Sequence, residues 1–366
     1  LLSTVSLIIY SMWIETGYGK IVLVCVASLV ISASGLLVKA SQVDGVILYS
    51  KFSVTLLSEF LKLCISGTFL VPSFIGNRPS KNDDDTFPTC RDVGLYSIPA
   101  FLYVIINNIK YPILERINPG VFSIVWNLKI AGVAFLLSFF LRREITRRKW
   151  LGVFLLVVGS SLAEASQWNS RPQSSPQEEE ITAAARVQGI ELVAIALIAV
   201  SVANVTCEYI YKKTTDSVIP VSFHKQNFVL YSWGVTLNSL AWFFIHIDSL
   251  QSFFQNYTRW TVAVVIMNGV SGYLVGAMFK YIDSIAAIFA DLIAMFTTAI
   301  VSAIVFELDI NLLFCLGFGV SSLSIWTYYG EEEEKTKVQI KNGNDEGAEM
   351  VTLISNWSQE EEEFSE

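Results

Sequence analysis

Residues 119–141 read PGVFSIVWNLKIAGVAFLLSFFL, an apolar stretch long enough to cross a lipid bilayer, with a single charge, Lys129, near its middle. A lysine near the centre of a bilayer costs about 2.5–3.5 kcal/mol on insertion scales. Such a side chain therefore faces a partner or a water-filled cavity and not lipid. We expect Lys129 to meet an anionic group.

The composition of the whole chain is that of an integral membrane protein. Of its 366 residues, 53% are hydrophobic and only 16% are charged, whereas soluble domains carry about 25% charged residues. Eleven of the 33 acidic residues lie in three runs, Glu178–Glu180, Glu331–Glu334 and Glu360–Glu363. Such runs are usually solvated and disordered. The net charge of −8 therefore says little about partners, and we expect no nucleic acid among them.

The sequence predicts neither a metal site nor a disulfide framework. Its five cysteines are scattered and include no Cys-x-x-Cys pair, and it contains only two histidines, His224 and His246. It also contains no metal-binding motif and no nucleophile elbow. We therefore expect a protein that is not an enzyme and that needs no cofactor.

Apolar segments of transmembrane length recur along the chain. A helix needs about 20 apolar residues to cross a bilayer, and ten such segments are predicted, at residues 20–40, 47–70, 93–110, 120–141, 150–167, 188–211, 221–246, 260–280, 283–306 and 311–329. The sequence begins at Leu1 and not at Met, so we expect residues 1–19 to belong to a truncated N-terminal segment.

The second of the two longest hydrophilic breaks, Gln167 to Arg186, divides the spans evenly. It separates a first half at residues 20–167 from a second half at 188–329 through a linker at 168–187, and an acidic, disordered tail follows at 330–366. Because five spans is an odd number, the second half enters the membrane with the opposite orientation, as in many secondary transporters. We predict an all-α polytopic membrane protein with ten transmembrane helices in two inverted five-helix repeats. The halves share no clear sequence identity, so ten helices without symmetry is the alternative.

The distribution of basic residues predicts that both ends of the chain are cytosolic. With that orientation, eleven lysines and arginines lie in cytosolic loops or span ends and five lie in the opposite loops, as the positive-inside rule requires. The acidic tail is then cytosolic and the linker lumenal. Of three N-x-[ST] sequons, only Asn256-Tyr257-Thr258 lies on the lumenal side outside a span, and it is close to the membrane.

Polar residues inside the spans mark a predicted site. Asn107, near the end of the third span, has an amide that can recognise a nucleobase edge or, alternatively, bond a neighbouring helix. Asn204 and Glu208 lie four residues apart and share a face of the sixth span, as do Asn227 and Tyr231 on the seventh. Each half thus contributes polar or aromatic groups to the expected interior.

Charged residues inside the spans fall into two groups. Glu59 and Lys62, three residues apart on the second span, can neutralise each other across one helical turn. We therefore interpret this pair as structural and not as substrate ligands. Asp291 lies in the ninth span without an oppositely charged sequence neighbour. Lys129 and Lys280 are both candidate partners, and a role of Asp291 in proton or substrate binding stays open.

Several of these motifs occur together and in a fixed order. They are Ser97-Ile98-Pro99-Ala100-Phe101-Leu102-Tyr103, Asn107-Asn108, Asn127-Leu128-Lys129, Ala203-Asn204 with Glu208, Gln226-Asn227 with Tyr231, and Lys280-Tyr281-Ile282-Asp283-Ser284-Ile285. In order and spacing the chain resembles the nucleotide-sugar transporters of the drug/metabolite transporter superfamily over about residues 20–329. Within that family it looks most like a divergent UDP-sugar branch of solute-carrier family 35, subfamily A.

This resemblance implies an antiporter of the Golgi membrane, or in second place of the endoplasmic reticulum. It would carry a nucleotide sugar, most closely a UDP-sugar, from the cytosol into the lumen and return a nucleoside monophosphate. Membrane lipid would surround it, and a homodimer is compatible with the sequence. The implied substrate site consists of Asn107, Lys129, Asn204, Asn227, Tyr231 and Lys280. A lysine in low dielectric attracts phosphate, and an aromatic ring can stack on a base.

Departures from the family pattern bear on specificity. Phe122 stands where relatives commonly have a tyrosine, and Trp126-Asn127 replaces a Tyr-Gln pair. Ala287 stands seven residues after Lys280, where CMP-sialic acid carriers place a second phosphate-contacting lysine. The loss of that cation argues against CMP-sialic acid as the substrate. A CMP-sialic-acid-type carrier and a non-transporting membrane scaffold acting through the acidic tail are the alternatives.

Overall fold

A computed structural model describes residues 17–42, 47–75, 87–114, 116–117, 119–143, 145–169, 183–215, 221–245, 253–306 and 311–330. Residues 1–16, most of the predicted linker and the acidic tail after Gly330 lie outside the described residues. The predictions for those segments therefore stay predictions.

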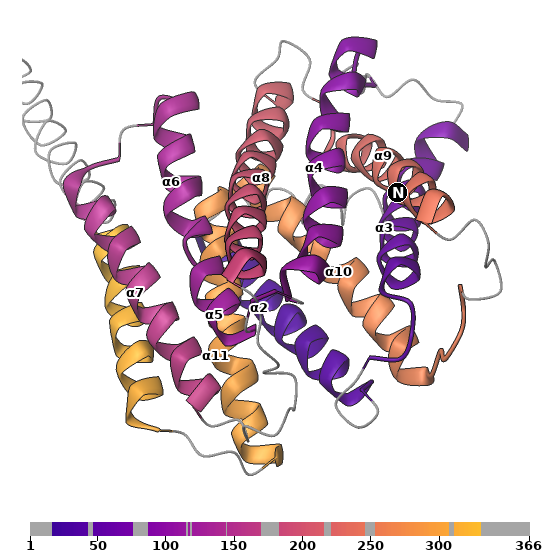
Figure 1. Cartoon of the computed structure of the whole chain (residues 1–366). Helices are drawn as coiled ribbons and strands as arrows, with labels where there is room; N and C mark the ends of the chain where they lie inside the picture. The colour runs from indigo at the N-terminus through magenta and orange to yellow at the C-terminus, as the bar shows by residue number, and fades with distance from the viewer. Residues whose placement is uncertain are drawn as a thin grey trace, which may run out of the picture.

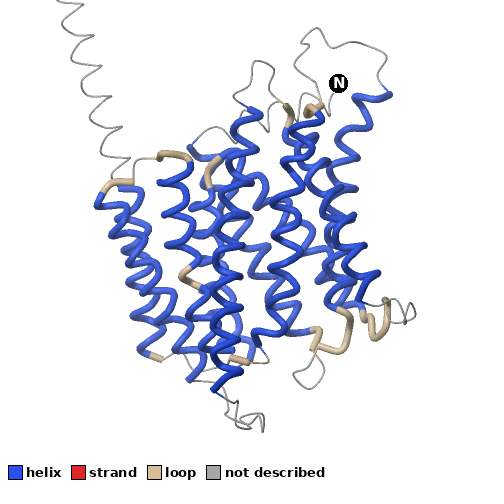
Figure 2. The backbone as a smooth tube through the Cα atoms, turned by 45° about the horizontal axis from the view of Figure 1, so that its top comes forward, coloured by secondary structure: helices blue, strands red, loops and turns tan. Residues whose placement is uncertain are grey.

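The described residues form helices and no strand, and the helices run alongside one another as a bundle (Figures 1 and 2). In chain order they are α2 (Gly17–Ala40), α3 (Lys51–Ile75), α4 (Cys90–Leu114), α5 (Pro119–Trp126), α6 (Lys129–Phe140), α7 (Arg147–Asn169), α8 (Ala183–Thr215), α9 (Phe223–Ile245), α10 (Arg259–Tyr281) and α11 (Ser284–Phe306). A last helix, Leu312–Gly330, follows α11.

Eight of the described helices are long and apolar enough to cross a membrane, by length and composition. The predicted all-helical membrane class is therefore confirmed, whereas the arrangement as ten spans in two repeats stays a prediction. Two of the ten predicted ranges account for the difference. The fourth contains the short helices α5 and α6, and the seventh contains α9, whose first turns carry His224, Lys225, Gln226 and Asn227.

The predicted fourth span is broken at its centre. α5 ends at Trp126 and α6 begins at Lys129. Between them the N–H of Asn127 donates to the carbonyl of Ile124 at 3.2 Å, and that of Leu128 donates to the carbonyl of Val125 at 3.0 Å. These bonds reach back three residues instead of four, which tightens the backbone locally. Lys129 therefore stands at the start of a new helix.

The outer surface of the bundle is apolar. Phe244, Ile304 and Leu312 are each about three-quarters exposed, at 74%, 75% and 76%. An apolar surface of this extent is what contact with lipid requires. Inside the bundle, small hydroxyl residues let helices approach closely, as where the Ser324 hydroxyl of the last helix donates to the carbonyl of Gly152 in α7 at 2.8 Å.

Helices of the two predicted halves interleave. α4 packs against α8 and α9, α10 packs against α2 and α3, and α3 also packs against α9. α11 lies against α2, and α6 against α8. The last helix, yellow in Figure 1, lies beside α7 at one side of the bundle. The interior of the bundle is thus walled by helices from both halves.

Candidate functional site

A cavity of about 380 Å³ lies among these interleaved helices. Its walls come from α2, α3, α4, α5, α6, α8, α9, α10 and α11, and its volume is in the range of small-molecule binding sites. Four of the six predicted site residues line it, namely Asn107, Lys129, Asn204 and Tyr231. Asn227 and Lys280 are not among the lining residues.

Lys129 enters the cavity as the first residue of α6. Its ammonium lies 3.2 Å from Oδ2 of Asp291, which comes from α11 and also lines the cavity. The side chains of Lys129 and Asp291 are 17% and 45% exposed. The ammonium also lies 5.8 Å from the centre of the Trp126 ring. The expected anionic partner of Lys129 is thus supplied within the chain by Asp291.

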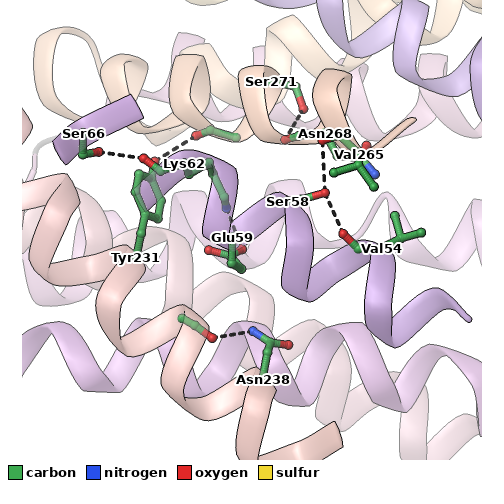
Figure 3. A network of polar contacts seen from close by, with 12 residues as sticks. Val54, Ser58, Glu59, Lys62, Ser66, Tyr231, Asn238, Val265, Asn268 and Ser271 are labelled. Atoms are coloured by element: carbon green, nitrogen blue, oxygen red, sulfur yellow. Dashed lines mark hydrogen bonds and ion pairs between the residues drawn. The ribbon is translucent and has the colours of Figure 1, made fainter. Parts of the chain in front are cut away.

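A second ion pair, Glu59 with Lys62 on α3, faces the same cavity. Their charged atoms are 2.6 Å apart, as the sequence predicted, and the Lys62 ammonium lies 4.7 Å from the centre of the Tyr231 ring on α9 (Figure 3). A Cβ atom at Gly234 would lie 2.8 Å from Glu59 Oε2, and one at Gly272 would lie 3.1 Å from Lys62 Nζ. The absence of side chains on these glycines makes room for the pair.

The location of the Glu59–Lys62 pair was missed from sequence. The three-residue spacing predicts that the two charges neutralise each other within one helical turn, which favours a structural role for the pair. A signal for a site existed, because ionisable residues inside a membrane span face a cavity or a pathway by default. The structure confirms that the pair forms and shows that it lines the cavity.

Uncharged polar groups form another part of the wall. The hydroxyl of Tyr103 on α4 donates to Oδ1 of Asn204 on α8 at 2.9 Å, and both residues line the cavity. Asn107 lines it from one turn further along α4. Its neighbour Asn108 instead donates to the carbonyl of Val104 in its own helix at 2.8 Å. Only the first amide of the Asn-Asn pair thus belongs to the wall.

Tyr231 and Asn227, expected to act together, lie at different depths. Tyr231 lines the cavity, and its hydroxyl lies 3.4 Å from the carbonyl of Gly272. Asn227 is fully buried behind the wall, where its Oδ1 accepts from the Tyr211 hydroxyl. Its Nδ2 has no hydrogen-bond partner among the described residues. Such a buried donor is uncommon and marks a place where a water or ligand atom fits.

Lys280 lies away from the cavity, at the end of α10. Its ammonium donates to the carbonyl of Val221 and to Oε1 of Gln226, both at 3.0 Å. These bonds tie the end of α10 to the beginning of α9. In the sequence, Lys280 stands at the end of the predicted span 260–280, which favours a structural role over a position in the cavity wall.

A charged cluster outside the cavity links the end part of α8 to the segments that follow α6 and α10. Glu208 on α8, only 1% exposed, accepts from the backbone N–H of Ser284 at 2.7 Å and from the Lys212 ammonium at 2.6 Å. Arg143, which follows α6, lies 3.0 Å from Asp283 and 3.8 Å from Glu208. Burial alone would lower the pKa of Arg143, but chiefly the charge of Asp283 raises it above the usual value for arginine.

Metal binding has no support in the described part of the chain, which contains no group of three His, Cys, Asp or Glu side chains placed to hold an ion. The groups that line the cavity are two ammonium groups, two carboxylates, amides and aromatic rings. This set suits a ligand that combines phosphate, ring and hydroxyl groups.

Comparison with known proteins identifies the family. The family model described as nucleotide-sugar transporter matches residues 18–329. The chain belongs to the nucleotide-sugar transporter family. A protein named CMP-sialic acid transporter 1 from Oryza sativa subsp. japonica is 28% identical over 307 residues, which cover 81% of this chain and 90% of that relative. Its namesake from Arabidopsis thaliana is 27% identical over 319 residues, with 85% and 90% covered.

A solved crystal structure shares the fold of this nucleotide-sugar transporter family member. It superimposes with a TM-score of 0.60 over 85% of this chain and 96% of its own, at 11% sequence identity. At that identity the likeness concerns the fold alone. The family membership agrees with a transporter and not with an enzyme. It does not decide between a UDP-sugar and CMP-sialic acid as the substrate.

Two departures from the nucleotide-sugar transporter pattern have different positions in the structure. Ala287 lines the cavity, so the lysine that the resemblance places there would have faced the ligand. Phe122 instead packs on Trp126, with ring centres 5.4 Å apart, and is not among the lining residues. Of these two substitutions, the one at Ala287 changes the charge of the cavity wall.

Proposed function

We propose that this protein exchanges a nucleotide sugar for a nucleoside monophosphate across the membrane, with a UDP-sugar as the cytosolic substrate. The single observation that carries the proposal is the placement of Lys129 as the first residue of α6 inside the cavity. An ionisable residue inside a membrane span that faces a cavity marks a substrate or ion site by default.

Two positive groups face the cavity. The first is the Lys129 ammonium, which stands beside the break, and the second is Lys62 of α3. The backbone N–H groups of Asn127 and Leu128 bond preceding carbonyls, so the ammonium groups and not the helix end are the donors for an anion. A nucleotide phosphate accepts charge-assisted hydrogen bonds from such groups. The Lys62 ammonium is paired with Glu59, 2.6 Å away.

The remaining wall suits a nucleoside. We propose that Asn107 and Asn204 bond the edge of the base or the ribose, and that the Tyr231 ring stacks on a planar group. Asn227 lies one helical turn before Tyr231, and its Nδ2, which has no partner among the described residues, is a donor that a water or ligand atom could use. Lys280, which bonds Val221 and Gln226, is left with a structural role in this scheme.

The charge of α11 favours a UDP-sugar over CMP-sialic acid. This helix presents Ala287 and, one turn later, Asp291 to the cavity. Sialic acid carries a carboxylate on the sugar, which an acidic wall repels, whereas the common UDP-hexoses carry an uncharged sugar. The relatives named CMP-sialic acid transporters make CMP-sialic acid the competitor to be tested.

The packing of the helices supports two inverted repeats and alternating access. In two repeats, each span of the first half corresponds to the span five places later in the chain, so that α2, α3 and α4 correspond to α8, α9 and α10. The contacts of α4 with α8 and α9 then correspond to the contacts of α10 with α2 and α3. In the same way the α6–α8 contact becomes the α11–α2 contact. We propose that the halves rock about the cavity, which lies between them. The Golgi is the proposed site of action, since lumenal glycosylation consumes nucleotide sugars.

A competition panel tests the proposal. Purified protein in proteoliposomes is given one labelled UDP-sugar together with unlabelled UMP, CMP, GMP, UDP-sugars or CMP-sialic acid. We expect UMP and UDP-sugars to reduce uptake most strongly and CMP-sialic acid to reduce it least. Strongest competition by CMP and CMP-sialic acid would reassign the substrate. Absence of nucleotide-dependent thermal stabilisation would favour the membrane scaffold, because a bound ligand stabilises the folded state.

A further inference from the structure

The ion pair inside the cavity joins the two halves of the protein. Lys129 belongs to α6 of the first half, and Asp291 belongs to α11 of the second half. The pair is direct, with 3.2 Å between charged atoms, and both residues line the cavity. Any relative movement of the halves at this level therefore acts on the pair.

Asp291 contacts the ammonium that the proposed function assigns to phosphate. A carboxylate oxygen and a phosphate oxygen accept the same kind of charge-assisted hydrogen bond from an ammonium group. Asp291 is also 45% exposed, so its bond to Lys129 is within reach of a ligand that enters the cavity. The carboxylate thus makes the contact with Lys129 that a phosphate oxygen could make.

We propose that Asp291 makes transport an obligatory exchange, because it takes the place of substrate phosphate on Lys129 in the empty carrier and holds the two halves together. An arriving phosphate replaces Asp291, and the link between the halves opens without leaving Lys129 unpaired. When the nucleotide leaves, Asp291 returns and the empty carrier cannot reorient. This inference rests on the proposed function, since it takes the ligand to be a nucleotide.

The other ion pairs described above do not combine these properties, and Glu208 with its partners Arg143 and Lys212 is not among the cavity residues. Glu59 and Lys62 face the cavity but lie on the same helix, so their pair does not link the halves. Arg143 and Asp283 link the halves, but neither is a cavity residue, so a ligand in the cavity does not reach them. The Lys129–Asp291 pair both crosses between the halves and faces the ligand space.

Efflux from proteoliposomes tests the inference. Vesicles loaded with labelled UMP are diluted into medium without nucleotide or with unlabelled UMP. For the parent protein we expect efflux to be at least tenfold faster when UMP is present outside. For Asp291→Asn, which removes the charge with little change in shape, we expect faster efflux into empty medium and a ratio that approaches one. Asp291→Glu, which keeps the charge, should retain exchange.

Asp92→Asn serves as the matched control, because Asp92 lies at the start of α4 outside the cavity and bonds Thr89. It should behave as the parent. If Asp291→Asn binds UMP and keeps the parent ratio of exchange to unaccompanied efflux, the inference is wrong while the proposed function stands. If the parent transports no nucleotide of the panel under either condition, the proposed function itself fails, and the inference fails with it.

Discussion

At the scale of single residues, Lys129 should dominate ligand affinity. A hydrogen bond to a charged group contributes about 1.5–3 kcal/mol, so Lys129→Ala should weaken UMP binding roughly tenfold to hundredfold. Calorimetric titration measures this change directly. The double variant Lys129→Ala with Asp291→Asn separates ligand binding from folding, because it leaves no unpaired carboxylate. If a folded double variant binds UMP with the parent affinity, Lys129 does not contact the ligand.

Glu208 should matter for the stability of the charged cluster at the end of α8. It is buried and contacts Ser284, Lys212 and, at longer range, Arg143. Removing one partner from a buried ionic group costs about 3–5 kcal/mol, so Glu208→Ala should lower the melting temperature in detergent markedly. Glu208→Gln keeps an acceptor for the Ser284 N–H and should lower it less. Equal effects of the two substitutions would contradict this role.

The residue scale also shows what a sequence can predict about the site. Lys129 was expected to need an anion because membrane burial of an unpaired ammonium is costly, and the structure supplies Asp291. Lys280 is a second candidate partner for Asp291 in the sequence, but it bonds Val221 and Gln226 instead. It stands at the end of α10, whereas Lys129 stands at the break between α5 and α6. Which carboxylate Lys129 meets is not readable from the spacing within one helix, because Asp291 comes from another helix.

At the scale of elements, close packing of α7 on the last helix depends on glycine. A Cβ atom at Gly317 would lie 2.7 Å from the backbone nitrogen of Ala163, whereas one at Gly319 would meet nothing within 4 Å. Overpacking of a tight contact costs about 1–3 kcal/mol. Gly317→Ala should therefore destabilise the protein, as measured by its melting temperature in detergent.

Gly319→Ala is the matched control for this contact. In the same helix it adds the same methyl group without a clash, and the higher helix propensity of alanine favours folding by up to about 1 kcal/mol. Its melting temperature should equal or exceed that of the parent. A Gly317→Ala variant as stable as Gly319→Ala would show that the two helices are not packed as closely as described.

Helix positions were predicted well from the sequence, and the break within the predicted fourth span was not. Apolar runs of about 20 residues mark spans because lipid demands them, and a helix lies over each predicted range. The run 119–141 has no proline or glycine between Trp126 and Lys129 that would announce an interruption. The three-residue hydrogen bonds of Asn127 and Leu128 form in the context of the bundle.

At the scale of the whole molecule, alternating access should change the reactivity of a native thiol. Cys207 is buried and lines the cavity, whereas Cys25, Cys64, Cys90 and Cys315 are exposed. With those four replaced by alanine, a small maleimide reaches Cys207 only through the open side of the cavity. Mass spectrometry should show slower modification when UMP is bound. The Lys129→Ala variant should lose this protection.

Equal modification of Cys207 with and without UMP in the parent would place the nucleotide elsewhere. A control ligand of similar size and no phosphate, such as uridine, should protect weakly because it does not engage Lys129. Protection by uridine equal to that by UMP would show that phosphate recognition is not the main source of affinity. Neither result would contradict the overall fold.

Fold class and family motifs were readable at this largest scale because they rest on composition and on the order of motifs along the chain. The position of the cavity could not be predicted from the sequence, because the cavity forms between helices of both predicted halves. Glu59 and Lys62 on α3 face Tyr231 on α9 across this space. Pairings of this kind arise only once the helices are assembled.

The most direct test of exchange is counterflow in proteoliposomes. Vesicles that contain the purified protein are loaded with UMP or left without nucleotide, and labelled UDP-sugar is added outside. The account predicts rapid accumulation of label in UMP-loaded vesicles and little in empty ones, with the Lys129→Ala variant inactive in both. Accumulation that does not depend on internal UMP, or no accumulation with any nucleotide pair, would contradict it.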